Sequence, residues 1–431
     1  MSSKRRQRVR ACRGGATEEP PPPASEPLLS DLLLEIFARS DAATVIRCAS
    51  TCRILRRGIL EPAFHRRRLA LQAAAPGGGL DPALLLGVSY QEYDRASEKT
   101  TRRVIHTPAP TQPRARLDAE SLDVQIQPHC FELQPVAARG GLLLLSPMPL
   151  EMSARSLLVF QRLRVCDALT GHFTSLPPIA VPSNTFPDVF LSVGDGGSFE
   201  LLLADRGMRF RIFSSLDGKW GVLRQASAPE INMAGSCRPA VIGRTVYYSC
   251  CMHEWDPNRW DQIVALDVEA AKATTMELPP GCRTRKRFSK RPMHLLLASV
   301  HGRLSLFVTE IHGIAMWTLK PDSSGSVAAW SRHLVIGNQE IKRQTGLEES
   351  YHLKSPRFSF HGFGERSGSM IMSLGKCGQI FRLDIGTMED EEAPVVRRLT
   401  SPGSVSVRRS IYQLFLHETD FISLLQGMKP F

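Results

Sequence analysis

The sequence predicts an α+β multidomain protein, in which small helices precede a large all-β, propeller-like domain of six or seven blades. Residues 27–72 carry apolar side chains at helical spacing, whereas residues 80–431 are short apolar segments divided by Gly, Pro, Ser and Asp. In this second part a unit recurs about every 50 residues, which is typical of propeller blades. Residues 1–26 form a basic, proline-rich tail that we expect to be disordered.

Three short amphipathic helices are expected near the N-terminus. The first covers residues 30–38. Asp41 is suited to cap the second, whose apolar stripe runs from Val45 to Ile59, and Pro62 suits the first position of the third. Helices this short bury little surface alone, so they need a partner or a neighbouring domain to complete their core.

An ordered set of residues in these helices matches a known docking motif: Leu28, Leu32, Leu33, Glu35, Ile36, Arg47, Cys48, Cys52, Arg56, Pro62 and Phe64. The segment resembles the F-box. It departs at Leu29 and Asp41, where prolines are usual, and at Leu55, where a tryptophan is usual. The resemblance implies docking on an Skp-family adaptor through Leu28, Leu29, Leu32, Ile36, Val45, Cys48, Cys52 and Leu55. An ordinary helical-bundle fragment is the alternative.

The repeat in the second part is a strand that ends in an aspartate and a turn. Asp167, Asp217 and Asp267 are spaced by 50 and then 50 residues, and a weaker copy stands at Asp384. We interpret these aspartates as turn formers whose side chains bind nearby backbone N–H groups, not as catalytic acids. A β-sandwich with extra strands is the alternative fold. This part resembles the propeller-like associated domains that follow the F-box in large plant F-box families.

The formal net charge of +12 comes from two basic runs, residues 4–13 and 283–291. Each contributes six Lys or Arg residues, and the other 42 basic residues balance the 42 acidic ones. Two local runs predict nucleic-acid binding less well than a basic face through a domain would, so we do not expect it. The first run is a possible nuclear import signal, with a solubilising tail or a transit peptide as alternatives.

The cysteines and the apolar segments suggest a place in the cell. Ten cysteines without a signal peptide predict reduced thiols, and no apolar run is long enough to span a membrane. We therefore expect a protein of the nucleus, the cytoplasm or both.

No catalytic motif is found, and neither a cofactor nor a metal site is expected. Contact with a protein target is instead expected from residues on predicted propeller loops, namely Trp255, Trp260, Arg285, Lys286 and Arg287. The alternative for the basic run is a charged loop that contacts only solvent.

The F-box resemblance implies the substrate-receptor subunit of an Skp-cullin-F-box ubiquitin ligase. Such a subunit docks on the adaptor, reaches a cullin-RING ligase through it, and holds an unknown protein target, without performing bond chemistry itself. The alternative is a non-ligase scaffold or a chromatin-associated binding protein that uses the propeller and the basic runs. A propeller enzyme is a third option, which requires a pocket on the propeller axis that gathers titratable groups from several blades.

Overall fold

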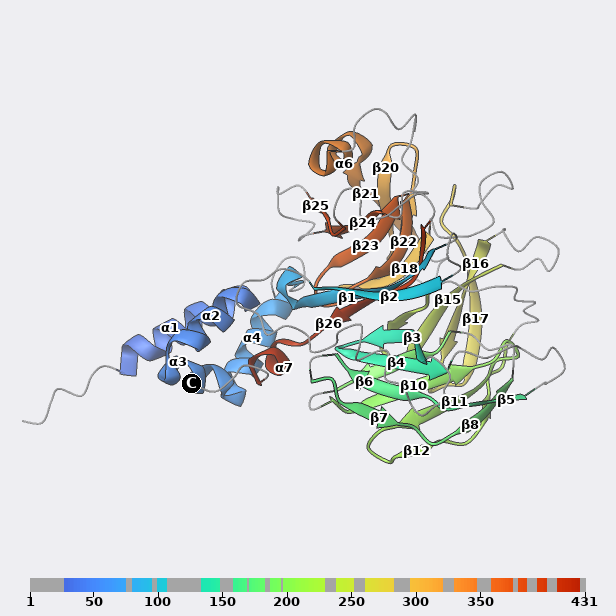
Figure 1. The fold of residues 1–431 in the computed structure, drawn as a ribbon, viewed down its shortest axis with the longest axis horizontal. Helices are drawn as coiled ribbons and strands as arrows, with labels where there is room; N and C mark the ends of the chain where they lie inside the picture. The colour runs from blue at the N-terminus through green and yellow to red at the C-terminus, as the bar shows by residue number, and fades with distance from the viewer. Residues whose placement is uncertain are drawn as a thin grey trace, which may run out of the picture.

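The structure is a computed structural model. It describes residues 27–74, 80–94, 99–106, 133–147, 158–168, 170–182, 187–194, 197–228, 238–251, 260–282, 295–320, 329–346, 358–374, 379–385, 394–400 and 409–426. The predicted disordered tail, 1–26, lies outside these residues. A group of helices projects from one side of a large all-β domain (Figure 1).

Four helices form the N-terminal part, which we call the helical cluster: α1 (Pro27–Arg39), α2 (Ala42–Thr51), α3 (Arg53–Leu60) and α4 (Pro62–Ala74). Asp41 caps α2 as predicted, because its carboxylate accepts a hydrogen bond of 2.7 Å from the Thr44 N–H. The second predicted helix is divided at Cys52. Its backbone is extended there (φ −141°, ψ 123°), so the apolar stripe belongs to two helices.

Five sheets with four strand positions each make the blades of a propeller. The first two are built from β3 (Leu133–Arg139), β4 (Leu142–Pro147), β6 (Arg164–Asp167) and β7 (Phe173–Ser175), then from β9 (Val189–Val193), β10 (Phe199–Ala204), β11 (Arg209–Ser214) and β12 (Lys219–Trp220) with β13 (Arg224–Gln225). The third is built from β14 (Ala240–Ile242), β15 (Thr245–Cys251), β16 (Trp260–Asp267) and β17 (Lys272–Glu277).

The last two blades contain β18 (Leu295–Val300), β19 (Arg303–Thr309), β20 (Gly313–Leu319) and β21 (Trp330–Gly337), then β22 (Phe358–Phe363), β23 (Ser369–Leu374), β24 (Gln379–Asp384) and β25 (Val395–Arg398). Helix α6 (Asn338–Thr345) joins them, and β5 (Leu158–Gln161) pairs with β8 (Ile179–Pro182) beside the first blade. Neighbouring strands within each blade pair antiparallel. The predicted alternation of short strands and turns is therefore a propeller.

A three-stranded sheet lies between the last blade and the first. It joins β1 (Leu85–Asp94) and β2 (Lys99–His106) to β26 (Arg409–Glu418), and β26 contacts both β3 and β22. Five blades are fewer than the six or seven predicted. The two ends of the domain supply this smaller sheet where the prediction placed further blades, and their pairing ties the ends of the domain together.

The repeated aspartates act at turns in two of the predicted copies. Asp167 accepts a hydrogen bond from the Thr170 N–H at 3.2 Å, and Asp267 accepts from the N–H groups of Glu269 and Ala270, both at 2.9 Å. Asp384 differs because it is buried. It accepts instead from the hydroxyl of Ser369 and from the guanidinium of Arg382.

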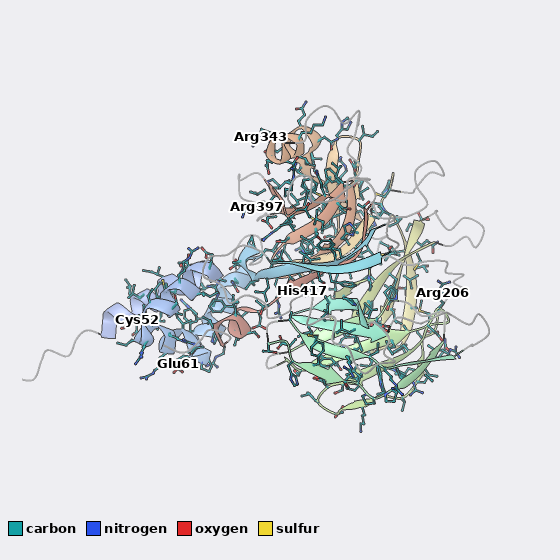
Figure 2. The ribbon with its side chains drawn as sticks, in the orientation of Figure 1. Cys52, Glu61, Arg206, Arg343, Arg397 and His417 are labelled. Carbon is teal, nitrogen blue, oxygen red and sulfur yellow. The ribbon has the colours of Figure 1, made fainter. Side chains whose placement is uncertain are left out.

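The chain returns to the helical cluster at its other end. Helix α7 (Phe421–Gln426) follows β26 directly, and the short helix η1 (Pro82–Leu84) precedes β1. Figure 2 shows Cys52 and Glu61 on the helical cluster and Arg206 on the far side of the propeller. The carboxyl end of β26 thus faces the helices, and the amino end faces away from them.

Candidate functional site

One apolar core joins the helical cluster to the propeller. It combines buried residues of the four helices with residues of η1, β1 and α7: Phe37, Ala38, Ala42, Val45, Ile46, Ala49, Ile59, Phe64, Leu84, Leu86, Leu424 and Leu425. The helices were expected to need a neighbour to complete their core. In this structure the two ends of the all-β domain supply it.

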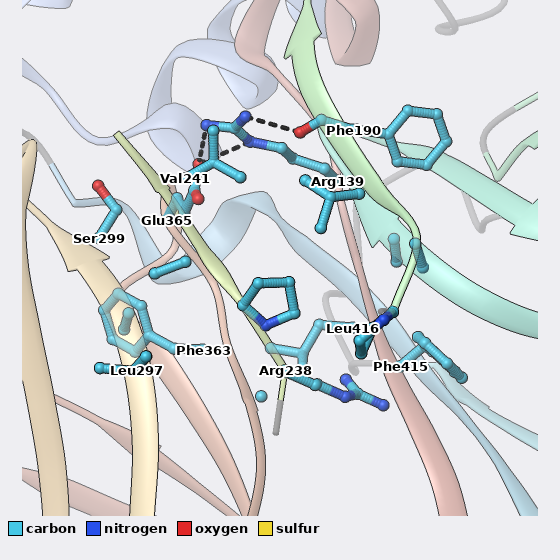
Figure 3. Close-up of a pocket in the computed structure, with 18 of the residues that line it drawn as sticks. Arg139, Phe190, Arg238, Val241, Leu297, Ser299, Phe363, Glu365, Phe415 and Leu416 are labelled. Carbon is cyan, nitrogen blue, oxygen red and sulfur yellow. Dashed lines mark hydrogen bonds and ion pairs between the residues drawn. The ribbon is translucent and has the colours of Figure 1, made fainter. Parts of the chain in front are cut away.

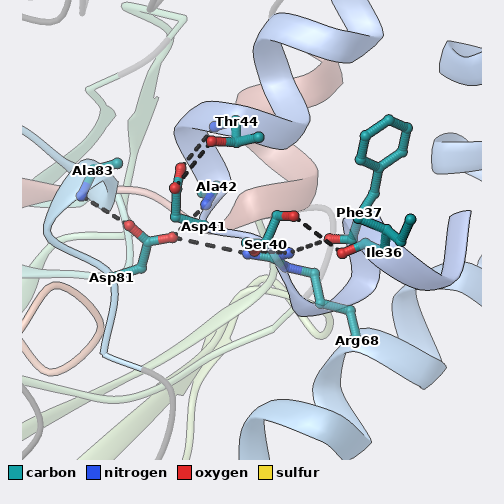
Figure 4. A network of polar contacts seen from close by, with 9 residues as sticks. All are labelled: Ile36, Phe37, Ser40, Asp41, Ala42, Thr44, Arg68, Asp81 and Ala83. Carbon is teal, nitrogen blue, oxygen red and sulfur yellow. Dashed lines mark hydrogen bonds and ion pairs between the residues drawn. The ribbon is translucent and has the colours of Figure 1, made fainter. Parts of the chain in front are cut away.

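A buried polar network fixes the same joint (Figure 4). The Arg68 side chain is 3% exposed, donates to the carbonyl oxygens of Phe37 (3.1 Å) and Ser40 (2.6 Å), and lies 3.8 Å from the Asp81 carboxylate. Its guanidinium also stacks over the ring of Phe421, 4.5 Å from the centroid. Burial lowers the pKa of Arg68, against the opposing effect of Asp81.

Asp81 ties this network to the backbone. Its carboxylate accepts hydrogen bonds from the Ala42 N–H at 2.6 Å and from the Ala83 N–H at 3.0 Å, so it caps the start of α2 and the turn of η1 at once. Because α2 and η1 belong to different parts of the chain, this one carboxylate sets how the helices sit on the propeller.

The opposite face of α1 is apolar and open to solvent. Leu32 and Ile36 are one helical turn apart, with 62% and 50% of their surface exposed. Further exposed aliphatic side chains of the cluster are Ile54, Leu60 and Leu69. In α1, Glu35 pairs with Arg67 and Arg39, each at 2.6 Å, and these hydrogen bonds lower the pKa of Glu35. A face of this kind is typical of a protein contact surface.

The other predicted adaptor residues are less accessible. Val45 is fully buried inside the cluster, and Cys48, Cys52 and Leu55 are half-buried. Leu28 and Leu29 belong to α1, but their side chains lie outside the described residues. The prediction therefore combined residues of the open face with residues that hold the helices together, because periodicity alone does not show which neighbour covers a stripe.

A second site, the axial cavity, runs between the innermost strands and has a volume of about 130 Å³. Its lining comes from β3, β9, β14, β18, β22 and β26 and from residues next to them, so each blade contributes to it. This is a pocket on the propeller axis of the kind that the enzyme option required. Sequence reasoning missed its lining residues, because they are far apart in the chain and share no motif.

An ion pair lies at the end of the cavity that is formed by the carboxyl ends of β3 and β22 (Figure 3). The Arg139 guanidinium contacts the Glu365 carboxylate at 2.9 Å and donates to the carbonyl oxygens of Phe190 (2.9 Å) and Leu191 (2.6 Å). Glu418 lies nearby and accepts from the Ser367 N–H at 2.7 Å; its pKa is raised, chiefly by burial. These groups are satisfied and stabilise this end of the cavity.

The amino end of the cavity holds two other charged residues, Asp188 and Arg238. Burial raises the pKa of Asp188 to about 7 and lowers the pKa of Arg238 to about 10. Near Arg238, burial and the guanidinium lower the pKa of His361 to about 3, and this imidazole shares a 2.7 Å hydrogen bond with Ser373. Strongly shifted groups in one cavity are typical of binding or catalytic sites.

Four of the predicted target-binding residues, Trp255, Arg285, Lys286 and Arg287, lie outside the described residues. Trp260 opens β16, but nothing of its side chain is described. Strand β15 ends at Cys251, just before the first of these loops, and β18 begins at Leu295, just after the second. Both Cys251 and Leu295 lie at the amino end of the cavity. The loops are thus anchored on the face where Asp188 and Arg238 lie.

Within the described ranges, no group of three or more His, Cys, Asp or Glu side chains is placed to hold a metal ion. Among the described helices, none is long and apolar enough to cross a membrane.

A family model described as "Domain of unknown function (DUF7595)" matches residues 87–431. The chain belongs to this family. The match covers the propeller and leaves out the helical cluster, and no F-box family is matched. No curated protein matches the chain.

Several solved structures share a distant likeness. With dihydro-heme d1 dehydrogenase NirN in complex with DHE the identity is 14% and the TM-score 0.29, over 65% of this chain and 50% of that one, so the chain spans half the length of that protein. With the α-L-arabinofuranosidase arb93a from Fusarium graminearum, in complex with an iminosugar inhibitor, the identity is 11% and the TM-score 0.32. That likeness covers 62% of this chain and 80% of the other. With KlAtg21 in complex with the coiled coil of AgAtg16 the identity is 10% and the TM-score 0.32, over 68% of this chain and 90% of the other.

Proposed function

We propose that this protein is the substrate-receptor subunit of an Skp-cullin-F-box ubiquitin ligase. The helical cluster docks on an Skp-family adaptor, and the propeller holds a protein target. The observation that supports this most is the open apolar face of α1 around Leu32 and Ile36, within the residues that resemble the F-box.

The energetics of this face favour a partner. Fully burying one exposed leucine or isoleucine side chain stabilises an association by about 1.5–3 kcal/mol. The protein covers the other side of the helices with η1 and α7 but leaves Leu32 and Ile36 in water. A surface that the fold itself does not cover is available to an adaptor without unfolding any part of the protein.

The buried joint suits the work of a receptor. A receptor performs no bond chemistry and acts by proximity, because it raises the effective concentration of a target lysine near the ubiquitin-charged enzyme. A loose connection between the docking helices and the target site lowers this effective concentration. The contacts of Arg68 and Asp81 join the helices to the propeller, which supports a fixed direction of the propeller relative to the docking helices.

Co-purification with an Skp-family adaptor tests the proposal. The double variant Leu32→Asp, Ile36→Asp places two carboxylates in the contact and should reduce the affinity more than a hundredfold, since each buried charge costs several kcal/mol. The matched control is Leu216→Asp, Ile311→Asp, which changes two exposed aliphatic residues of the propeller. Retention of the adaptor by the first variant, or failure of the wild type to bind any Skp-family adaptor, would contradict the proposal.

The competing prediction is that the protein is a scaffold or a chromatin-associated binding protein, which uses the propeller and the basic runs and belongs to no ligase. Both runs, 4–13 and 283–291, lie outside the described residues. Salt distinguishes the two: binding to nucleic acid through basic residues weakens steeply with added salt, whereas apolar docking of α1 barely responds.

A further inference from the structure

Asp188 is a buried carboxylate that the fold does not use. It lines the axial cavity and is 8% exposed, and no residue that the structure describes donates a hydrogen bond to its carboxylate. The phenol of Tyr248 is close enough to feel its charge, but burial is the one cause of the shifted pKa of Asp188 itself. A largely buried carboxylate without a protein donor is therefore available to a cationic group that enters the cavity.

Arg238, at the same end of the cavity, has more N–H donors than acceptors around it. Its guanidinium stacks 4.2 Å from the centroid of the Phe415 ring and donates to the Leu414 carbonyl oxygen. A guanidinium carries five N–H donors, and no second acceptor for them is found in the described part of the chain. The stacking holds the group flat, which is the arrangement in which arginine binds a carboxylate through two parallel hydrogen bonds.

The two charges do not neutralise one another. No ion pair joins Asp188 to Arg238, and no arginine contributes to the pKa shift of Asp188. Asp188 directly precedes β9 and Arg238 stands two residues before β14, and these are the innermost strands of neighbouring blades. Both groups therefore line one cavity, from neighbouring blades. Figure 3 shows Arg238 well apart from the Arg139–Glu365 pair.

We propose that the axial cavity binds a small zwitterion with an apolar body, whose ammonium group pairs with Asp188 and whose carboxylate pairs with Arg238. A ligand with one charge would pair with one of the two residues and leave the other without an ion-pair partner in the cavity. Part of the remaining wall is apolar and accepts a hydrocarbon side chain: Val136, Val189, Ala240, Leu296, Phe363 and Leu416. A free amino acid and a short peptide both carry this chemistry.

Calorimetric titration of the full-length protein tests the proposal. L-leucine and the dipeptide glycyl-L-leucine are the zwitterionic probes, and they separate a free amino acid from a peptide by the distance between their charges. Two half-probes keep the body and lose one charge: 4-methylpentanoate lacks the ammonium group, and isoamylamine lacks the carboxylate. One zwitterion should bind, and both half-probes should bind about ten- to a hundredfold more weakly than it does.

The matched variants assign each charge. Asp188→Asn should weaken binding of the zwitterion about tenfold or more and leave the affinity for 4-methylpentanoate unchanged. Arg238→Gln should weaken binding of the zwitterion by the same factor and leave the affinity for isoamylamine unchanged. Asp217→Asn and Arg206→Gln change exposed residues outside the cavity and should bind like the wild type. Asp188→Asn removes a buried charge and is expected to fold. It therefore tests the proposal even if Arg238→Gln does not fold.

Two results would overturn this proposal: no zwitterion binding to the wild type at ~10 mM, an affinity too weak to matter, or equal binding by the wild type and Asp188→Asn. The outcome does not depend on the adaptor, because no helix residue enters the titration. A failed titration and a failed co-purification therefore reject different statements.

Discussion

The two proposed binding surfaces, one on the helical cluster and one in the axial cavity, differ in the groups they expose. On α1 the exposed groups are apolar, and Leu32 and Ile36 lie four residues apart on one helix. In the cavity the groups available to a ligand are charged, and Asp188 and Arg238 come from different blades. The first surface is set by local periodicity and stays open to water, whereas the second exists only when the ring of blades is complete. Contact with a large partner suits the first, and enclosure of a small molecule suits the second.

The strongest test of how the two regions are connected is Arg68→Ala. It leaves Asp81 as a buried charge without its partner and removes the donor to Phe37 and Ser40, so it should lower the free energy of unfolding by about 3–5 kcal/mol. Urea unfolding followed by circular dichroism measures this. A variant as stable as the wild type would mean that the joint does not hold the two regions together.

Leu424→Ala weakens the same joint without touching a charge. Leu424 is fully buried against the helices, so its truncation should cost about 2–4 kcal/mol through lost burial and the cavity that remains. Hydrogen exchange should show faster opening of α1–α4, with the blades far from α7 unchanged. Equal loss of protection in every blade would show that the helices and the propeller unfold as one unit.

Asp188→Asn probes the cavity through pH. The pKa of Asp188 is raised from 3.8 to about 7 in the fold, so the protonated carboxyl stabilises the folded protein below about pH 4, and this stabilisation is lost as the pH rises to about 7. The variant should therefore be more stable than the wild type at pH 8, by up to about 4 kcal/mol, with the difference nearly gone at pH 4. Thermal melts at the two pH values measure it, and parallel pH profiles would contradict the assignment.

The smallest effect is expected on the open face of the helices. Glu35→Gln removes the exposed ion pairs to Arg39 and Arg67, which water and salt screen. The melting temperature should not change measurably, and adaptor binding should keep its weak response to salt. A large loss of stability would show that α1 depends on these pairs and would place them with the buried network.

Local pattern explains which features were predictable. The Asp41 cap and the strand-and-turn repeat at Asp167 and Asp267 depend on residues near one another in the chain, and the structure shows all of them. The unbroken helix from Val45 to Ile59 was wrong, because an apolar stripe keeps its spacing across the extended residue Cys52. The blade count was too high, since the ends of the domain pair with each other through β1 and β26.

By itself the sequence determined the order of helices before strands, the propeller repeat and the helix that carries Leu32 and Ile36, because these follow from spacings within a few residues. Tertiary structure alone decided that Val45 is covered and Ile36 is not, that Asp81 clasps α2, and that Asp188 and Arg238 face one cavity. The physical reason is that burial and the pairing of charges depend on neighbours brought together by the closure of the ring, and no local pattern specifies those neighbours.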